Sequence, residues 1–225
     1  MMKQSKKLSY SSYGSGNIFY ALFIPEGPIK DCIDAIRYIS SPTEKKSAHI
    51  TVRGPYKEQI KKSRLEKLNF ALRGNLVHIS NPGNFFNNKD QNTVFFNCQG
   101  TQLESVWKKK DYGYHPHITL YDGSDKSFAQ ELYNVLGNYQ FDLSFEAEKL
   151  VMITRSKGQT SMELSFSLNN ELFRPWGKDF LNTTHLIDNM STDEKISLIS
   201  KITKNLQNLS IETTSSQPKV SFINY

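Results

Sequence analysis

Two short segments of this chain repeat one arrangement of residue types that could act on a phosphodiester. His49-Ile50-Thr51 lies within residues 48–53 and His117-Ile118-Thr119 within residues 115–121, both among β-favouring residues. Side chains two apart on a strand share a face, so each motif is expected to present an imidazole beside a hydroxyl. Two imidazoles facing each other can serve as base and acid at neutral pH. Phosphodiester chemistry at a ribose needs that pair, and it needs no metal.

Five further side chains are candidates for binding a substrate. The same alternation places Arg53 beside the first motif, where its guanidinium group could donate two hydrogen bonds to a phosphate. It places Tyr121 beside the second motif, where the side chain could bind phosphate or stack on a base. His115 shares the parity of His117, although an exposed or supporting role is the preferred interpretation. Tyr56 and Phe85 are aromatic residues near the motif strands that could stack on a nucleobase. The alternatives are a solvent-facing strand end for Arg53 and packing roles for the aromatic residues.

The order of the predicted elements also repeats, over about 70 residues. Strand, helix, motif strand and helix are expected at 18–24, 28–39, 48–53 and 57–72, and again at 93–98, 102–109, 115–121 and 126–136. A strand at 76–79 and an Asn-rich loop at 81–92 separate the two sets, and long strands are expected at 141–154 and 161–167. An internal duplication would bring the two histidines together across a pseudo-two-fold axis.

Three regions follow from this pattern. Residues 1–16 are expected to form a flexible leader, residues 17–167 a core of two pseudo-symmetric lobes, and residues 168–225 a C-terminal extension. The extension contains an amphipathic helix at about 192–209 and a polar tail. The apolar stripe of that helix could meet a partner chain or fold back on the core.

Composition narrows the class of protein. The 225 residues carry a net charge of +6, with a pI near 9.1, which favours an anionic partner without identifying it. Cys32 and Cys98 have neither metal-site nor disulfide-framework spacing, so free buried thiols are expected. No membrane span or signal peptide is predicted, and a cytoplasmic protein is the default expectation. No cofactor and no metal site are expected, because no carboxylate or cysteine cluster accompanies the histidines.

The two motifs and their surroundings resemble the 2H phosphoesterase superfamily, which includes 2′-5′ RNA ligases and cyclic phosphodiesterases. The resemblance rests on His49-Ile50-Thr51 and His117-Ile118-Thr119, on Tyr114-His115-Pro116 and Leu120-Tyr121 around the second motif, and on the segment 81–96. It covers roughly residues 17–167. It implies a duplicated, bilobal α+β fold with two antiparallel sheets around a central cleft and helices outside. It also implies that His49, Thr51, His117 and Thr119 are the catalytic residues.

The sequence leaves three functions open. The first is a metal-independent phosphodiesterase acting on a 2′,3′-cyclic phosphate, a 2′-5′ linkage or an RNA end. The second is an enzyme that degrades a cyclic oligonucleotide or 2′-5′ oligoadenylate signal, as some members of the superfamily do. The third is an RNA-binding module without turnover. The symmetric motifs do not tell which histidine is base and which is acid, nor whether the reaction is hydrolysis or ligation, and the oligomeric state stays open.

Overall fold

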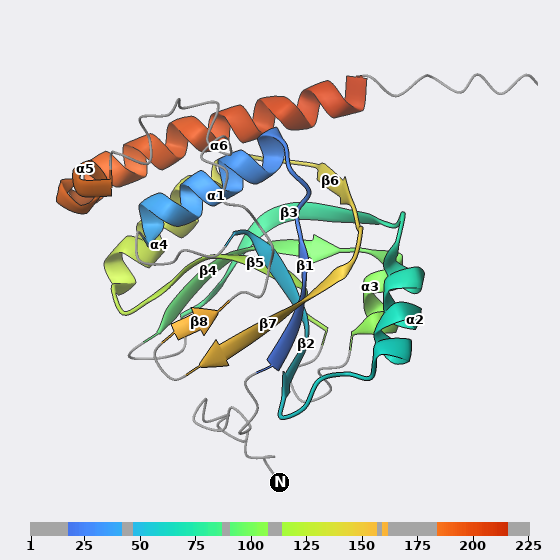
Figure 1. Cartoon of the computed structure of the whole chain (residues 1–225). Helices are drawn as coiled ribbons and strands as arrows, with labels where there is room; N and C mark the ends of the chain where they lie inside the picture. The colour runs from blue at the N-terminus through green and yellow to red at the C-terminus, as the bar shows by residue number, and fades with distance from the viewer. Residues whose placement is uncertain are drawn as a thin grey trace, which may run out of the picture.

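A curled antiparallel sheet with helices packed against it gives this α+β protein its shape (Figure 1). The computed structural model describes residues 18–41, 47–86, 91–107, 114–156, 159–161 and 184–215. Its strands are β1 (Ile18–Phe23), β2 (His49–Tyr56), β3 (Leu76–Phe85), β4 (Asn92–Gln99), β5 (His117–Gly123), β6 (Leu143–Glu146), β7 (Leu150–Ser156) and β8 (Gln159–Ser161). Its helices are α1 (Pro28–Ser40), α2 (Lys62–Leu72), α3 (Thr101–Val106), α4 (Lys126–Gly137), α5 (Thr184–Asn189) and α6 (Thr192–Ser215). The predicted leader and the end of the tail lie outside the described residues.

The strands form one eight-stranded sheet in the order β6-β3-β4-β5-β2-β1-β7-β8. The family resemblance implied two separate sheets, and the structure differs because the two motif strands, β2 and β5, pair with each other at the centre. That pairing joins a half made of β6, β3, β4 and β5 to a half made of β2, β1, β7 and β8. The two motifs therefore lie on neighbouring strands in the middle of one sheet rather than on two separate sheets.

The helices pack in two groups. Figure 1 shows α1, α4 and α6 together on one side of the molecule, and α2 with α3 beside the other end of the sheet. α1 starts with Pro28 at its first turn after Gly27, whose φ of 149° suits a glycine. Asp125 caps the N-terminus of α4, because its carboxylate accepts a 2.9 Å hydrogen bond from the Phe128 amide.

The C-terminal helix is part of this packing. Ile199, Ile202 and Leu206 of α6 are fully buried in the main core, and α6 lies across α1 and α4. Polar contacts add to the attachment, since the Ser210 hydroxyl accepts from the Asp142 amide at 2.8 Å and the Tyr139 and Ser200 hydroxyls are 2.8 Å apart. Of the two possibilities for the apolar stripe, the structure has the helix folded back on the core.

Three predicted boundaries are wrong, two of them because of strand pairing. Residues 81–85, expected in a loop, extend β3 because they pair with β4, and a register shift between Ile79 and Pro82 accommodates the proline. The helix expected over 57–72 begins only at Lys62. The long strand expected over 141–154 divides into β6, which pairs with β3, and β7, which pairs with β1. Residues 147–149 carry the chain from one half of the sheet to the other.

Both cysteines are buried and free, as the sequence predicts. Burial raises the pKa of the Cys32 thiol to about 11 and raises the pKa of Cys98 as well. The reactive thiolate is therefore scarce near neutral pH. We expect a thiol-specific disulfide reagent at pH 7.5 to label neither cysteine in the folded protein and to label both after denaturation, as followed by absorbance. Rapid labelling of the native chain would contradict this burial.

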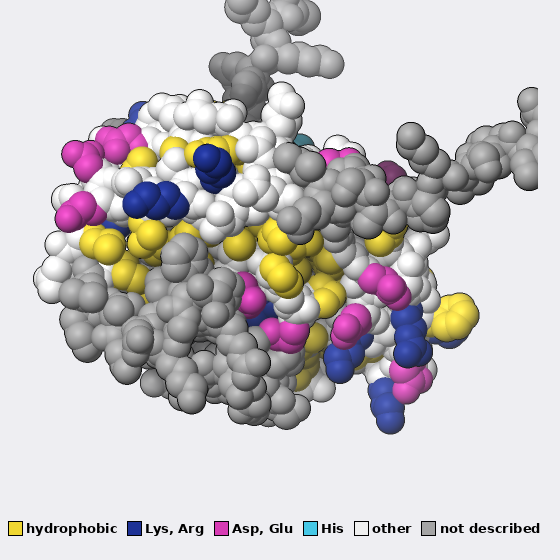
Figure 2. Space-filling model, turned by 90° about the horizontal axis from the view of Figure 1, so that it is seen from above, with side chains coloured by type: hydrophobic (Ala, Val, Ile, Leu, Met, Phe, Trp, Pro, Cys, Tyr) yellow, Lys and Arg dark blue, Asp and Glu magenta, His cyan; other side chains and the backbone are white. Residues whose placement is uncertain are grey.

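The positive charge of the chain is not gathered on the face seen in Figure 2. Basic and acidic side chains of the described residues are interspersed there with hydrophobic ones. That face therefore offers no single-sign surface among the described residues for a polyanion. Separately, each described helix is too short or too polar to cross a lipid bilayer.

Candidate active site

The pairing of β2 with β5 brings the two motifs side by side. The two strands are antiparallel, and Ile50 is the partner of Ile118. Continued by one residue on each side of this pair, an antiparallel register sets His49 opposite Thr119 and Thr51 opposite His117. Directly opposite residues of an antiparallel pair have Cβ atoms about 4.5–5.5 Å apart. The four side chains thus form one compact group with each histidine facing the threonine of the other motif.

This group lies on the face of the sheet that points away from the main core. Ile50 and Ile118 are fully buried in the core, so the alternation of a strand directs their neighbours to the opposite face. His49, Thr51, His117 and Thr119 are all partly exposed. A ligand can therefore reach the four side chains that the motifs predict.

Both histidines are held by the same kind of contact. His49 Nδ1 lies 2.8 Å from the Ser47 carbonyl oxygen, and His117 Nδ1 lies 2.7 Å from the His115 carbonyl oxygen. A carbonyl oxygen only accepts, so each Nδ1 must carry the proton of the bond. The neutral form of each ring therefore has its lone pair on Nε2, which is the nitrogen suited to take or give a proton.

Aromatic rings flank both imidazoles. The ring of Phe23 lies 5.3 Å from that of His49, while Phe95 and Phe85 lie 4.8 Å and 5.9 Å from that of His117, measured between centroids. Phe85 was a candidate from the sequence. Phe23 and Phe95 were not, because only the register places Phe23 opposite His49 and Phe95 opposite Thr119. The rings give the group an apolar surround.

Gly83 on β3 makes room for one of these rings. A Cβ at Gly83 would lie 2.4 Å from Cε2 and 2.6 Å from Cζ of Phe95. Phe95 itself packs on Phe85, with centroids 4.6 Å apart, and on His117, so its ring cannot retreat without disturbing the histidine. The glycine is thus part of what positions His117.

We expect Gly83→Ala to lower the catalytic efficiency proposed below by about tenfold or more, because a misplacement of 1 Å is costly in catalysis. Overpacking should also lower the free energy of unfolding by about 1–3 kcal/mol. Initial rates and urea denaturation measure the two effects. Gly137→Ala is the control, since a Cβ there meets nothing within 4 Å. Equal behaviour of the two variants would contradict the role of Gly83.

A matching irregularity in each motif strand redirects two of the predicted residues. The pairing of β2 with β1 shifts between Tyr20–Arg53 and Ala21–Thr51, and the pairing of β5 with β4 shifts between Val94–Tyr121 and Phe95–Thr119. Each shift inserts one extra residue after the threonine, which interrupts the alternation of side chains. The parity argument for Arg53 and Tyr121 therefore fails at these positions.

Tyr121 belongs to the core instead of the candidate site. It is buried, its ring packs 5.2 Å from that of Phe128, and its hydroxyl accepts from the Asp125 amide at 3.1 Å. Arg53 is 5% exposed and pairs with Tyr20, whose ring lies in the core. Arg53 Nε has no hydrogen-bond partner among the described residues. The expected contacts of these two side chains with substrate are thus not supported.

The remaining candidates lie near the motifs in different ways. His115 has an exposed side chain and contributes its backbone carbonyl, which holds His117. This agrees with the preferred supporting role. Tyr56 is partly buried at the end of β2, with its ring 6.2 Å from that of Tyr20, and packs against the core.

Helix α1 supplies two side chains that sequence reasoning missed. Asp34 accepts from the Ser47 hydroxyl at 2.7 Å and from the Ala48 amide at 2.5 Å, which fixes the start of the first motif strand. Arg37 donates to the carbonyl of Thr119 in the second motif. One helix therefore holds both motif strands. The only signal in the sequence is the i, i+4 spacing of Lys30 and Asp34, which form a 3.1 Å ion pair.

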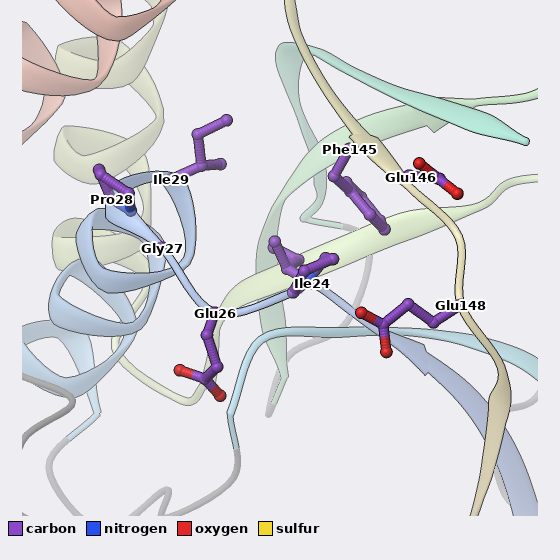
Figure 3. Close-up of a pocket in the computed structure, with 9 residues that line it drawn as sticks. Ile24, Glu26, Gly27, Pro28, Ile29, Phe145, Glu146 and Glu148 are labelled. Carbon is purple, nitrogen blue, oxygen red and sulfur yellow. The ribbon is translucent and has the colours of Figure 1, made fainter. Parts of the chain in front are cut away.

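A cavity elsewhere does not include the motifs. It measures about 460 Å³ and lies between the end of β1, the start of α1 and the end of β6 (Figure 3). Glu26, Glu146 and Glu148 are among its lining residues, together with Ile24, Pro25, Gly27, Pro28, Ile29 and Phe145. Three carboxylates disfavour a phosphate there.

Neither a metal cluster in the described residues nor a matching protein points to a function. Among the described residues, no three His, Cys, Asp or Glu side chains lie close enough together to hold a metal ion. The sequence matches no protein-family model and no curated protein. The function must therefore be argued from the site itself.

Proposed function

We propose that this protein is a metal-independent phosphodiesterase of the 2H type, which cleaves a ribose-linked phosphodiester by acid–base catalysis. The substrate class is a 2′,3′-cyclic phosphate, a 2′-5′ linkage or an RNA end. The observation that carries the proposal is the pairing of Ile50 with Ile118, because it sets the imidazole of each motif against the hydroxyl of the other on an accessible face. A site that only binds RNA has no need of two such imidazoles.

The proposal includes a duplicated origin for the two halves of the sheet. The order strand, helix, motif strand, helix occurs as β1-α1-β2-α2 and again as β4-α3-β5-α4. β3 follows the first set and pairs with β4, the first strand of the second set. In the same way, β7 comes after the second set and pairs with β1, the first strand of the first set. The shifts at Arg53 and Tyr121 fall at equivalent places, two residues beyond the threonine of each motif. These correspondences support two related lobes with the motifs at the axis between them.

The chemistry follows from the four side chains. One neutral imidazole removes a proton from water through Nε2 while the water oxygen attacks phosphorus. The other imidazole, protonated, gives its Nε2 proton to the departing ribose oxygen as the phosphorus–oxygen bond breaks. With a linear substrate, the adjacent ribose hydroxyl takes the place of water and a cyclic phosphate forms. The hydroxyls of Thr51 and Thr119 hydrogen-bond the non-bridging oxygens, where negative charge accumulates.

The aromatic surround favours a nucleotide over a simple phosphodiester. Phe85, Phe95 and Phe23 lie beside the imidazoles, and stacking of one base on an aromatic side chain contributes about 1–3 kcal/mol. Phe23 and Phe85 are partly exposed whereas Phe95 is buried, so Phe85 is the accessible ring beside His117. A base that stacks on Phe85 would hold its phosphate near His117.

Incubation with a substrate panel tests the proposal. The panel contains nucleoside 2′,3′-cyclic phosphates, a 2′-5′ oligoadenylate, cyclic dinucleotides and a short RNA, with products separated by chromatography. Turnover of at least one member, retained in the presence of a chelator and lost in a His49→Ala, His117→Ala double variant, is the expected result. Turnover of the oligoadenylate or a cyclic dinucleotide alone would assign the signal-degrading function. Tight RNA binding without turnover would overturn the proposal in favour of a binding module.

A further inference from the structure

An asparagine lies directly beside one of the motif histidines. Strands β3, β4 and β5 are neighbours in the sheet (Figure 1), and the register of β4 with β5 pairs Asn97 with His117. Asn97 is partly exposed, while its neighbours Phe96 and Cys98 are buried in the main core. The alternation of β4 therefore directs the Asn97 side chain to the face that carries His117. Opposite Cβ atoms in such a pair are about 4.5–5.5 Å apart, so a nucleotide bound at His117 also meets this amide group.

An irregularity in β3 fixes the orientation of the amide group. The pairing of β3 with β4 shifts between Ile79 and Pro82, so that residues 80 and 81 stand opposite Asn97 alone. Across this bulge, Asn97 Nδ2 donates to the Asn81 carbonyl oxygen at 2.8 Å. A carbonyl oxygen only accepts, so the amide nitrogen faces β3 and Oδ1 lies on the other side of the amide. Within the described residues, Oδ1 has no hydrogen-bond partner.

An aromatic surface adjoins this amide group. Gly83 marks the point of contact, because a Cβ there would lie 2.4 Å from Cε2 of Phe95 and 3.2 Å from Nδ2 of Asn97. The Phe95 ring and the Asn97 amide are therefore next to each other. Phe85 extends the surface, with its ring 4.6 Å from that of Phe95 and 5.9 Å from that of His117, measured between centroids. Rings with a polar group at their margin match a nucleobase, which has an apolar face and a polar edge.

The edge of the amide can distinguish one base from another. Nδ2 has a second N–H, so Asn97 offers a donor and an acceptor side by side. Adenine and cytosine complement it, because their exocyclic amino group donates and the adjacent ring nitrogen accepts. In the same position, hypoxanthine or uracil sets a carbonyl oxygen against Oδ1 and a ring N–H against the amide N–H. Turning the amide over to suit these bases would break its bond to Asn81.

We propose that Asn97 and Phe85 form a nucleobase subsite beside His117, which selects a base with an exocyclic amino group, adenine or cytosine. Phe85 stacks on the base, Asn97 Oδ1 accepts from the amino group, and Asn97 Nδ2 donates to the ring nitrogen next to it. Thr51 lies across from His117 on the β2 side, so the phosphate is held between the motif strands while the base extends over β4 and β3. This inference rests on the proposed function and deepens it by specifying the class of nucleotide.

Deleting the amino group from the substrate tests the subsite. The substrates are the 2′,3′-cyclic phosphates of adenosine, of purine riboside, which has hydrogen in place of the amino group, and of inosine. In the wild-type chain, kcat/KM for the adenosine compound should exceed that for each of the others by about tenfold. In Asn97→Ala, the three values should lie within about threefold of one another. A merely structural role of Asn97 would lower all three values alike and keep their ratio.

Gln99→Ala is the matched control, because it removes an amide from the same face of β4 beyond the last residue that pairs with β5. It should keep the preference for the adenosine compound. Equal rates for the three substrates in the wild-type chain, or a preference that survives in Asn97→Ala, would overturn the inference. The first of these outcomes needs no variant, so it decides the question even if Asn97→Ala does not fold.

Binding separates this inference from the proposed function. Isothermal titration calorimetry of the full chain with adenosine 3′-monophosphate and purine riboside 3′-monophosphate measures the base preference without turnover. The first should bind about tenfold more tightly to the wild-type chain, and both should bind alike to Asn97→Ala. Equal wild-type affinities, or no binding of either, would overturn the subsite and leave the proposed function standing. If the chain cleaves no phosphodiester, the proposed function fails, and the calorimetry still decides the subsite.

Discussion

Replacing either motif histidine by alanine is expected to lower kcat/KM for a nucleoside 2′,3′-cyclic phosphate by about 10²–10⁴-fold. Each ring supplies one proton transfer in the transition state, and each is held by its Nδ1 contact so that Nε2 faces the reaction. Because the rings act as a pair, the double variant should lose little more than the more damaged single variant. Initial rates over a range of substrate concentrations measure the effect.

His115→Ala is the control for this prediction, because His115 contributes its carbonyl rather than its exposed side chain. It should keep kcat/KM within about threefold, which corresponds to less than 1 kcal/mol. The wild-type pH–rate profile should be bell-shaped, since one ring must be neutral and the other charged. A flat profile from about pH 5 to 9, or a loss below about tenfold in both single variants, would refute the two-histidine mechanism.

The largest effect on stability is expected from the C-terminal helix. Ile202→Ala on α6 should lower the free energy of unfolding by about 2–5 kcal/mol, because the side chain is fully buried and its removal leaves a cavity beneath α6. Denaturant titration followed by circular dichroism measures the change. The fall in activity should follow the fraction of unfolded protein, since α6 contributes none of the four motif residues.

Lys201→Ala tests whether the loss comes from burial, because Lys201 is the exposed neighbour of Ile202 on the same helix. Its effect should stay within about 0.5 kcal/mol. If Ile202→Ala is equally mild, α6 does not pack on the core in solution as it does here. The stripe would then be open to the partner chain that the sequence also allowed.

The sequence by itself determined the local features of this protein. Two identical triplets among β-favouring residues predict an imidazole and a hydroxyl on one face, and the alternation of Ile50 and Ile118 with them holds in the structure. Helix periodicity likewise predicted α1, α4 and α6, whose apolar stripes are buried. These features depend on residues close together in the chain, so their spacing is sufficient to reveal them.

Only the tertiary structure decided which strands pair and in what register. That pairing sets His49 opposite Thr119, brings Phe95 to His117, and shifts Arg53 and Tyr121 out of alternation. It also brings Asp34 to the Ser47–Ala48 peptide group. The strand pairing behind these contacts is made by backbone hydrogen bonds, which every residue type except proline can form. Residue types along one strand therefore carry no record of its partner, and a one-residue shift reverses the direction of every side chain beyond it.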